Sequence, residues 1–341
     1  GGLQVVTSLD LPTQEYAQQA AREHLQEIAE RYDAHNAAVV VLDAKTAEIR
    51  AMVGSLNYDD ASIDGKVNMA LAPRQPGSSF KPYVYATAFA QGYTPATMVM
   101  DVRTSFMDTY NQAPYVPENY SRNYHGPMLL RRALACSYNI PAVAVTQKVG
   151  AMRVVETAHA MGINTLNNPV YGLSVGLGSG EVSLLDHTFG FSVFANGGYM
   201  VGQPVSEERW KPGYRRLDPV AIVKVTDAQG KVLDEYREPQ RQQVIRPDVS
   251  YLVTDILSDN RARTPAFGAD NPLTLPDRPV AAKTGTTNSF RDGWAMGYTP
   301  QYVVGVWVGN ANYQQMKGGA DGVRGLDRGD DLSGEADRRR H

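Results

Sequence analysis

Residues 74–82 read RQPGSSFKP and place turn-forming residues directly before a run that looks helical. Ser78 would therefore lie near a helix N-terminus, a position that favours developing negative charge. Lys81 falls on the same helical face. It could accept the Ser78 hydroxyl proton if burial or a neighbouring cation keeps the Lys81 amino group neutral. A serine three residues before a lysine is common, however. Taken alone, the pair is better explained by a helix cap and a solvated lysine.

Two further segments carry polar groups suited to acyl transfer. Ser137-Tyr138-Asn139 presents a hydroxyl and an amide in what looks like a loop between helices. Lys283-Thr284-Gly285-Thr286 presents an ammonium group and two hydroxyls around a glycine that lets a ligand approach a strand closely. Taken separately, the segment 137–139 is also explained by an ordinary turn, and the segment 283–286 is also explained by an edge strand with a bulge.

Strand-like runs lie at both ends of the chain, over 37–42 and 48–53 and over 280–286, 293–298 and 302–308. A helix is predicted for 11–32. The middle looks mostly helical, over 81–91, 128–137, 142–161, 184–196 and 248–258, with a hairpin over 220–236. A strand pair completed by strands from the other end, with a helical block inserted, predicts an α/β sandwich of two lobes. Catalytic residues would line the groove between the lobes.

Composition excludes several other classes of protein. The 341 residues carry 33 basic and 36 acidic side chains, a net charge of -3, which gives no electrostatic case for nucleic acid as a partner. Cys136 is the single cysteine, so an internal disulfide framework is excluded. The six histidines show no metal-ligand spacing, and we predict no metal and no cofactor. No apolar run approaches the roughly 20 residues that span a bilayer.

In chain order, the segments that begin at Ser78, Ser137 and Lys283 resemble the SxxK, SxN and KTG signature of the penicillin-recognising serine acyltransferases. The wider sequence resembles the transpeptidase domain of class A, bifunctional penicillin-binding proteins over nearly all of 1–312. Beyond the three motifs, the similar stretches are GGLQVVTSLD at 1–10, LGSGEV at 177–182, FANGG at 194–198, DGW at 292–294 and VWVG at 306–309.

The resemblance implies a β-lactamase/D,D-transpeptidase-like α/β fold, in which helices flank a five-stranded antiparallel sheet and a mostly helical lobe is inserted. It divides the chain into a linker at 1–10, leading in from a glycosyltransferase domain, and a transpeptidase domain at 11–316. For 317–341, rich in Gly, Asp and Arg, we predict a disordered tail, which departs from the apolar segment and terminal helix usual in the family. The parent protein is expected to carry the glycosyltransferase domain and a membrane anchor upstream of Gly1, and to work outside the cytoplasm.

Carried over by motif, the family's chemistry makes Ser78 the nucleophile that attacks the carbonyl between two terminal D-alanines of a bacterial peptidoglycan stem peptide. D-alanine leaves, and an amine then takes the acyl group, with D,D-carboxypeptidase as a side activity. Lys81 is the expected base, Lys283 disfavours its charged form by like-charge proximity, and Ser137 relays a proton to the leaving amine.

The remaining roles concern binding. The backbone N–H groups of Ser78 and Thr286 are the expected oxyanion hole, and Gly285 permits the close approach. The hydroxyls of Thr284 and Thr286 would hold the terminal carboxylate, and Asn139 would hydrogen-bond a backbone amide of the stem peptide. A β-lactam presents the same carboxylate and carbonyl, so β-lactam antibiotics are expected to be covalent inhibitors.

Two alternatives stay open. A secreted β-lactamase shares the three motifs, but it needs a group that activates water, and the sequence identifies none. In addition, Tyr138 stands where the lactamase pattern has aspartate. A non-catalytic β-lactam receptor or scaffold also remains compatible with intact motifs.

Overall fold

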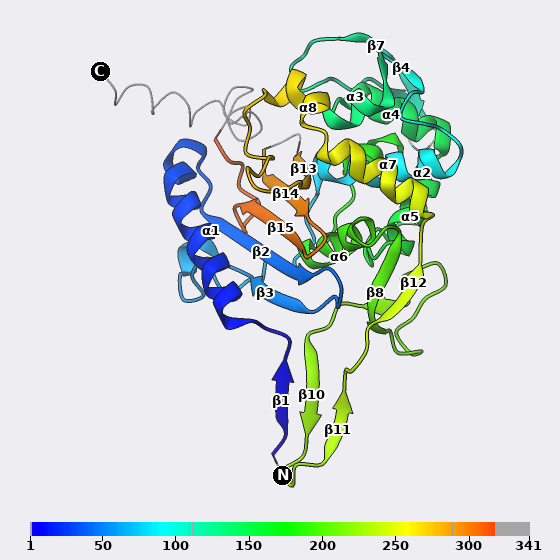
Figure 1. Ribbon diagram of the computed structural model, residues 1–341. Helices are drawn as coiled ribbons and strands as arrows, with labels where there is room; N and C mark the ends of the chain where they lie inside the picture. The colour runs from blue at the N-terminus through cyan, green and yellow to red at the C-terminus, as the bar shows by residue number, and fades with distance from the viewer. Residues whose placement is uncertain (1, 109, 111, 288–289, 318–341) are drawn as a thin grey trace.

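The computed structural model describes residues 2–108, 110, 112–287 and 290–317. Its centre is a five-stranded antiparallel sheet (Figure 1). The strand order is β13 (Ala281–Thr286), β14 (Asp292–Tyr298), β15 (Tyr302–Gly309), β2 (Asn36–Asp43) and β3 (Ile49–Val53). Two strands from the start of the chain thus complete three from its end, which confirms the predicted architecture.

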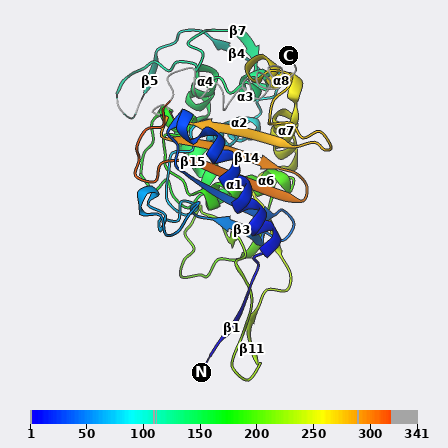
Figure 2. The same ribbon diagram turned by 90° about the vertical axis from the view of Figure 1, so that its left-hand side faces the viewer.

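Strand β2 is buried on both faces because the sheet is covered on both sides. Its side chains alternate, so Val40 and Leu42 join the main core while Val39 and Val41 join a separate cluster under α1 (Leu11–Tyr32). Figure 2 shows α1 lying across this outer face of the sheet.

Helix α1 has the bounds predicted from the sequence. It begins where the Asp10 carboxylate accepts a hydrogen bond from the Thr13 backbone N–H at 3.1 Å, a side-chain N-cap. It ends at Asp33, which adopts the left-handed conformation with φ 54°.

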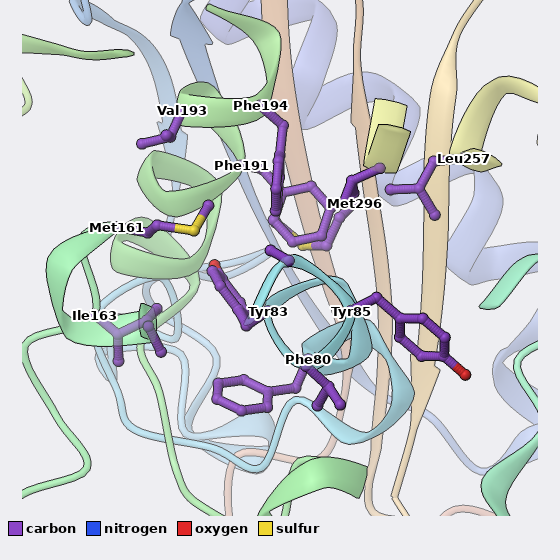
Figure 3. Packing of buried hydrophobic residues seen from close by; sticks show 14 of the residues in the cluster. Phe80, Tyr83, Tyr85, Met161, Ile163, Phe191, Val193, Phe194, Leu257 and Met296 are labelled. Atoms are coloured by element: carbon purple, nitrogen blue, oxygen red, sulfur yellow. The ribbon is translucent and has the colours of Figure 1, made fainter. Parts of the chain in front are cut away.

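The inner face of the sheet packs against α6 (Leu184–Ala195), which lies between the sheet and α2 (Lys81–Ala90). Helix α2 is the central helix of the molecule, since every residue from Lys81 to Phe89 is buried. Figure 3 shows Tyr83 of α2 facing the aromatic rings that α6 contributes. The Tyr83 ring centroid lies 6.2 Å from those of both Phe191 and Phe194. The segment that carries Ser78 and Lys81 is therefore fixed to a rigid core.

Two predicted helices are wrong in extent. The first two residues of the predicted helix 128–137 belong to strand β7 (Gly126–Leu129), and the helix itself covers only Leu130–Ala135. Residues 142–161 do not form a single helix but belong to α4 (Asn139–Val149) and α5 (Ala151–Ala160). The break falls at Gly150, whose φ of 93° lies outside the right-handed helical region. The other helices are α3 (Leu130–Ala135), α7 (Pro247–Ser258), α8 (Asn260–Phe267) and the 3-10 turns η1 (Ala61–Ile63), η2 (Gly77–Phe80) and η3 (Leu173–Leu177).

Outside the five-stranded sheet the chain also forms short strands, most of which were not predicted from the sequence. They form four small sheets: β1 (Gln4–Thr7) with β10 (Ile222–Thr226) and β11 (Val232–Glu235); β12 (Gln240–Gln243) with β8 (Tyr199–Pro204) and β9 (Leu217–Asp218); β4 (Met98–Asp101) with β7 (Gly126–Leu129); and β5 (Phe106–Asp108) with β6 (Ala113–Tyr115). The β10–β11 hairpin was predicted, and Figure 1 shows it extending from the main body beside β1.

The predicted domain limits stay predictions. Residues 4–7, assigned to a linker, form strand β1 in the structure. Of the predicted tail, 318–341 lies outside the described residues. Within the described part of the chain, no helix combines the length and apolar character needed to cross a membrane.

Candidate active site

Ser78 lies in the 3-10 turn η2, immediately before α2, at the wall of a cavity of about 280 Å³. Its side chain is partly exposed, whereas Lys81, one turn further on, is completely buried. The cavity is lined by Ser78, Asn119, Tyr120, Ser121, Asn123, His125, Cys136, Ser137, Tyr138, Pro265, Ala266, Phe267, Thr284, Gly285 and Thr286.

Glycines bring the Ser78 turn into direct backbone contact with strand β13. A Cβ on Gly77 would lie 2.4 Å from the Thr286 carbonyl oxygen, and one on Gly285 would lie 2.2 Å from the Pro76 carbonyl oxygen. Both neighbours are backbone atoms that cannot move aside easily. Gly77 also has a φ of 53°, which disfavours other residues. Glycine at these two positions therefore holds Ser78 against the edge of β13.

Arg74 anchors the chain as it enters this turn. The buried guanidinium lies 3.1 Å from the Asp292 carboxylate and stacks 3.6 Å from the Tyr313 ring centroid. Trp307 donates its indole N–H to the same carboxylate at 2.9 Å. Burial raises the pKa of Asp292, while the Trp307 and Arg74 contacts oppose that shift. The Arg74 backbone also pairs with Val182, so the turn is tied to the segment that precedes α6 as well as to β14.

A buried histidine supports the turn from behind. The Ser79 hydroxyl donates to the Pro76 carbonyl oxygen at 2.7 Å, so at 2.9 Å it must accept from His187 Nε2–H. His187 Nδ1 then accepts from the Tyr83 hydroxyl at 3.1 Å. Burial lowers the pKa of His187 to about 3, so the ring is neutral at pH 7.

Because His187 is buried and neutral, we expect the free energy of unfolding to fall in acid. The unfolded chain binds a proton at His187 below about pH 6.5, whereas the folded chain does not until about pH 3. The stability that comes from keeping His187 neutral is therefore fully present above pH 6.5 and is lost as the pH falls. At pH 5 the free energy of unfolding should be about 2 kcal/mol lower on this account than above pH 6.5. Urea unfolding of the native chain and His187→Gln, compared from pH 7.5 to 5, checks this. A difference between the two that does not change with pH contradicts it.

Ser137 joins the two predicted lysines. Its hydroxyl oxygen accepts from Lys283 Nζ at 2.8 Å and from Lys81 Nζ at 3.4 Å, and its carbonyl oxygen also accepts from Lys81. Ser137 adopts a φ of 60° between α3 and α4, which turns it toward both lysines. Lys283 also donates to the Thr284 carbonyl oxygen at 2.8 Å and is buried. One hydroxyl thus bridges the amino groups of two lysines.

Asn139 is engaged within the protein. Its Oδ1 accepts from Lys81 Nζ at 2.7 Å and its Nδ2 donates to the Glu118 carbonyl oxygen at 2.8 Å. Asn139 is not among the residues that line the cavity, so these contacts place it behind the cavity as a partner of Lys81.

The structure therefore brings the predicted site residues together. Ser78, Ser137, Thr284, Gly285 and Thr286 line one cavity, and Lys81, Lys283 and Asn139 join it through hydrogen bonds. Among the described residues, no group of three or more His, Cys, Asp or Glu side chains could hold a metal ion.

Sequence reasoning assigned no role to His125, which also lines the cavity. Its Nδ1 lies 2.6 Å from the carboxylate of Asp101, and its ring stacks on Tyr138 at 4.2 Å between centroids. The two partners are 24 residues apart, Asp101 at the end of β4 and His125 just before β7, so no local motif marks them.

This fold and this cavity define a transpeptidase domain of the penicillin-binding type. The family described as "Transpeptidase: Penicillin binding protein transpeptidase domain" matches residues 37–323, and the chain belongs to it. The similar proteins include Penicillin-binding protein 1A of Neisseria flavescens, 33% identical over 277 residues, which are 80% of this chain and 32% of that protein. Penicillin-binding protein 1A of Pseudomonas aeruginosa is 30% identical over 309 residues, 81% of this chain and 37% of that protein. The chain thus spans about a third of these relatives.

Solved structures agree with the fold. The penicillin-binding protein PonA1 from Mycobacterium tuberculosis superimposes with a TM-score of 0.73 at 24% identity, over 92% of this chain and 78% of that one. PonA1 has also been solved in complex with penicillin V. The predicted fold class is confirmed.

Proposed function

We propose that the chain is a peptidoglycan D,D-transpeptidase that works through an ester on Ser78 and is acylated by β-lactams. One observation carries this proposal: Ser137 Oγ lies between Lys81 and Lys283 in the same site as Ser78. This arrangement supports the assignment of a nucleophile, a base and a proton relay to one site.

Lys81 is the base of the acylation step. Two like charges repel more strongly in a buried site than in bulk water, because less solvent screens them. Because Lys81 and Lys283 both reach the Ser137 hydroxyl, this repulsion favours a state in which one of them is neutral. A neutral Lys81 takes the Ser78 hydroxyl proton, and Ser137 carries a proton to the departing D-alanine amine.

Strand β13 supplies the binding groups. Thr284 and Thr286 line the cavity, and the buried Lys283 donates to the Thr284 carbonyl oxygen, which supports a carboxylate-binding site here. The backbone N–H groups of Ser78 and Thr286 are the proposed oxyanion donors, and the direct contact between the turn and β13 supports this pairing. A single such donor is typically worth about 3 kcal/mol of transition-state stabilisation.

Asn139 contributes to this mechanism through Lys81. Its Oδ1 accepts from the lysine and fixes the direction of Nζ, while Nδ2 retains a second N–H for a stem-peptide carbonyl. Contact with the stem peptide remains part of the proposal.

Transfer is favoured over β-lactam hydrolysis. Among the described residues that line the cavity, none is Asp or Glu, so no lining carboxylate is available to activate water. We therefore expect the acyl-enzyme to hydrolyse slowly and to persist until an amine takes the acyl group.

The biological setting belongs to the proposal as well. The relatives are penicillin-binding proteins of which this chain spans about a third. We propose that the parent protein carries a glycosyltransferase domain and a membrane anchor, and that this domain works on the outer side of the cytoplasmic membrane. Its partners are then stem peptides ending in D-Ala-D-Ala.

A donor and acceptor assay tests this function. The purified chain is given a synthetic donor peptide ending in D-Ala-D-Ala and an amine acceptor, and products are identified by mass spectrometry. A cross-linked product with stoichiometric D-alanine release is expected, together with slow nitrocefin turnover. Rapid nitrocefin turnover would identify a β-lactamase instead. Formation of the donor acyl-enzyme without any transfer would identify a receptor.

A further inference from the structure

His125 is held in one orientation at the cavity wall by a buried carboxylate. The Asp101 side chain has no exposed surface, and it accepts from His125 Nδ1 at 2.6 Å and from the His125 backbone N–H at 3.0 Å. The Asn119 amide donates to both of its oxygens, at 2.8 and 2.9 Å. The His125 ring also stacks on Tyr138 with the two planes 24° apart. Hydrogen bonds and stacking together leave the imidazole little rotational freedom.

This arrangement also fixes the tautomer. Because Asp101 Oδ2 accepts from Nδ1, the proton of a neutral ring sits on Nδ1 and the basic lone pair is on Nε2. An aspartate that orients a histidine in this way is the second half of an acid–base unit. Asn119 links the unit to the SxN segment, since its Oδ1 accepts from the Asn139 backbone N–H at 2.8 Å.

Other titratable side chains around His125 are poor proton acceptors near neutral pH. Burial, ahead of the contact with Cys136, raises the pKa of Tyr138 to about 12. Burial likewise raises the pKa of the Cys136 thiol, and Arg132, which lies near both groups, opposes each shift only partly. Histidine is the side chain that ordinarily titrates between pH 5 and 8.

We propose that His125, oriented by Asp101, accepts the proton of the incoming acceptor amine in the second half of the transfer. This rests on the proposed function. The acceptor's ammonium group gives one proton to His125 Nε2, and the freed electron pair forms the C–N bond to the acyl carbon. The C–O bond to Ser78 Oγ then breaks, and the amine's second proton passes through Ser137 to that oxygen. The imidazolium returns its proton to water. Lys81 thus serves the donor half, Ser137 carries a proton in both halves, and His125 adds a base for the acceptor half.

The experiment separates the two halves of the reaction. The full chain and its variants are acylated by a thioester donor, and the acyl-enzyme is partitioned between water and added D-alanine at pH 7.5. His125→Asn should lower the ratio of aminolysis to hydrolysis by about 100-fold, the lower end of what a positioned general base contributes. Acylation by the same donor should change far less. Asp101→Asn should reproduce this loss although the histidine is present, because an amide at 101 donates to Nδ1 and moves the ring proton to Nε2.

Hydroxylamine distinguishes a base from a structural residue. This acceptor is already unprotonated at neutral pH and needs no base for deprotonation, so it should restore transfer by His125→Asn to near the native ratio. The matched control is His159→Asn, because His159 also stacks on a tyrosine, Tyr214, at 4.1 Å, but does not line the cavity. It should behave as the native chain does.

The inference is overturned if His125→Asn keeps the native partition ratio, if it loses acylation and aminolysis in parallel, or if hydroxylamine fails to restore transfer. Failure of the native chain to form an acyl-enzyme is a different result, because it overturns the proposed function itself.

Discussion

Penicillin is expected to add one equivalent to the native chain and nothing to Ser78→Ala. Ser78 is the serine that both lines the cavity and lies in the turn leading to buried Lys81, so its hydroxyl is the one positioned to open the lactam ring. Ring opening leaves no departing fragment, so the adduct has the full mass of the drug. Intact-mass spectrometry after incubation with excess penicillin measures the change directly.

Ser121→Ala is the matched control for this result, because Ser121 lines the same cavity on the opposing loop. It should retain the full adduct. Peptide mapping of the native adduct should place it within 74–82. An adduct that survives Ser78→Ala at equal stoichiometry would remove Ser78 from the mechanism, and with it the assignment of Lys81 as its base.

The residues that sequence reasoning found are those with strong local signals. Ser78 and Lys81 lie one helical turn apart, and 283–286 lies on a strand whose glycine is required by direct contact with the turn. Spacing along the chain indicated the chemistry, but only the fold brings the three segments to one cavity. The bridging position of Ser137 depends on its left-handed conformation, which no propensity predicts.

The residues that sequence reasoning missed are linked by long-range contacts. Asp101 contacts His125 only because β4 pairs with β7. Arg74 forms an ion pair with Asp292, which lies more than 200 residues further along the chain. Hydrophobic periodicity carries no information on such polar pairs, because each partner interrupts an apolar pattern at a single position. The break at Gly150 was missed for a related reason, since one glycine within a helical pattern is often tolerated.

The electrostatics of the site give a reason for its order of events. In the proposed reaction, two lysines on one hydroxyl would make the cavity attractive to the carboxylate of a donor peptide before acylation. After acylation, an incoming ammonium group meets the same positive charge, which disfavours its approach. A separate base paired with a buried carboxylate, His125 with Asp101, would offset that repulsion on the acceptor side.

Replacement of Lys81 by methionine is expected to slow acylation by penicillin by about 10²- to 10⁴-fold, the usual contribution of a positioned proton acceptor. Methionine retains most of the apolar stem that fills the buried site, and it removes only the nitrogen that Asn139 and Ser137 hold. Asn139 Oδ1 loses its donor, which costs about 1–3 kcal/mol of stability, so acylation must be measured well below the unfolding temperature. Stopped-flow measurement across penicillin concentrations separates the limiting acylation rate from the affinity of the initial complex.

The loss should fall on the limiting rate for Lys81→Met and chiefly on initial affinity for Lys283→Met. Of the two lysines, Lys283 is the one on β13, beside the threonines that we propose bind the carboxylate. Lys148→Met is the matched control, since Lys148 is exposed on the neighbouring helix α4. A limiting rate for Lys81→Met equal to that of the native chain would mean that another group takes the Ser78 proton. Lys283 would then be the nearest candidate, because Ser137 connects it to the same site, and the proton path would run from Ser78 through Ser137 in the opposite direction.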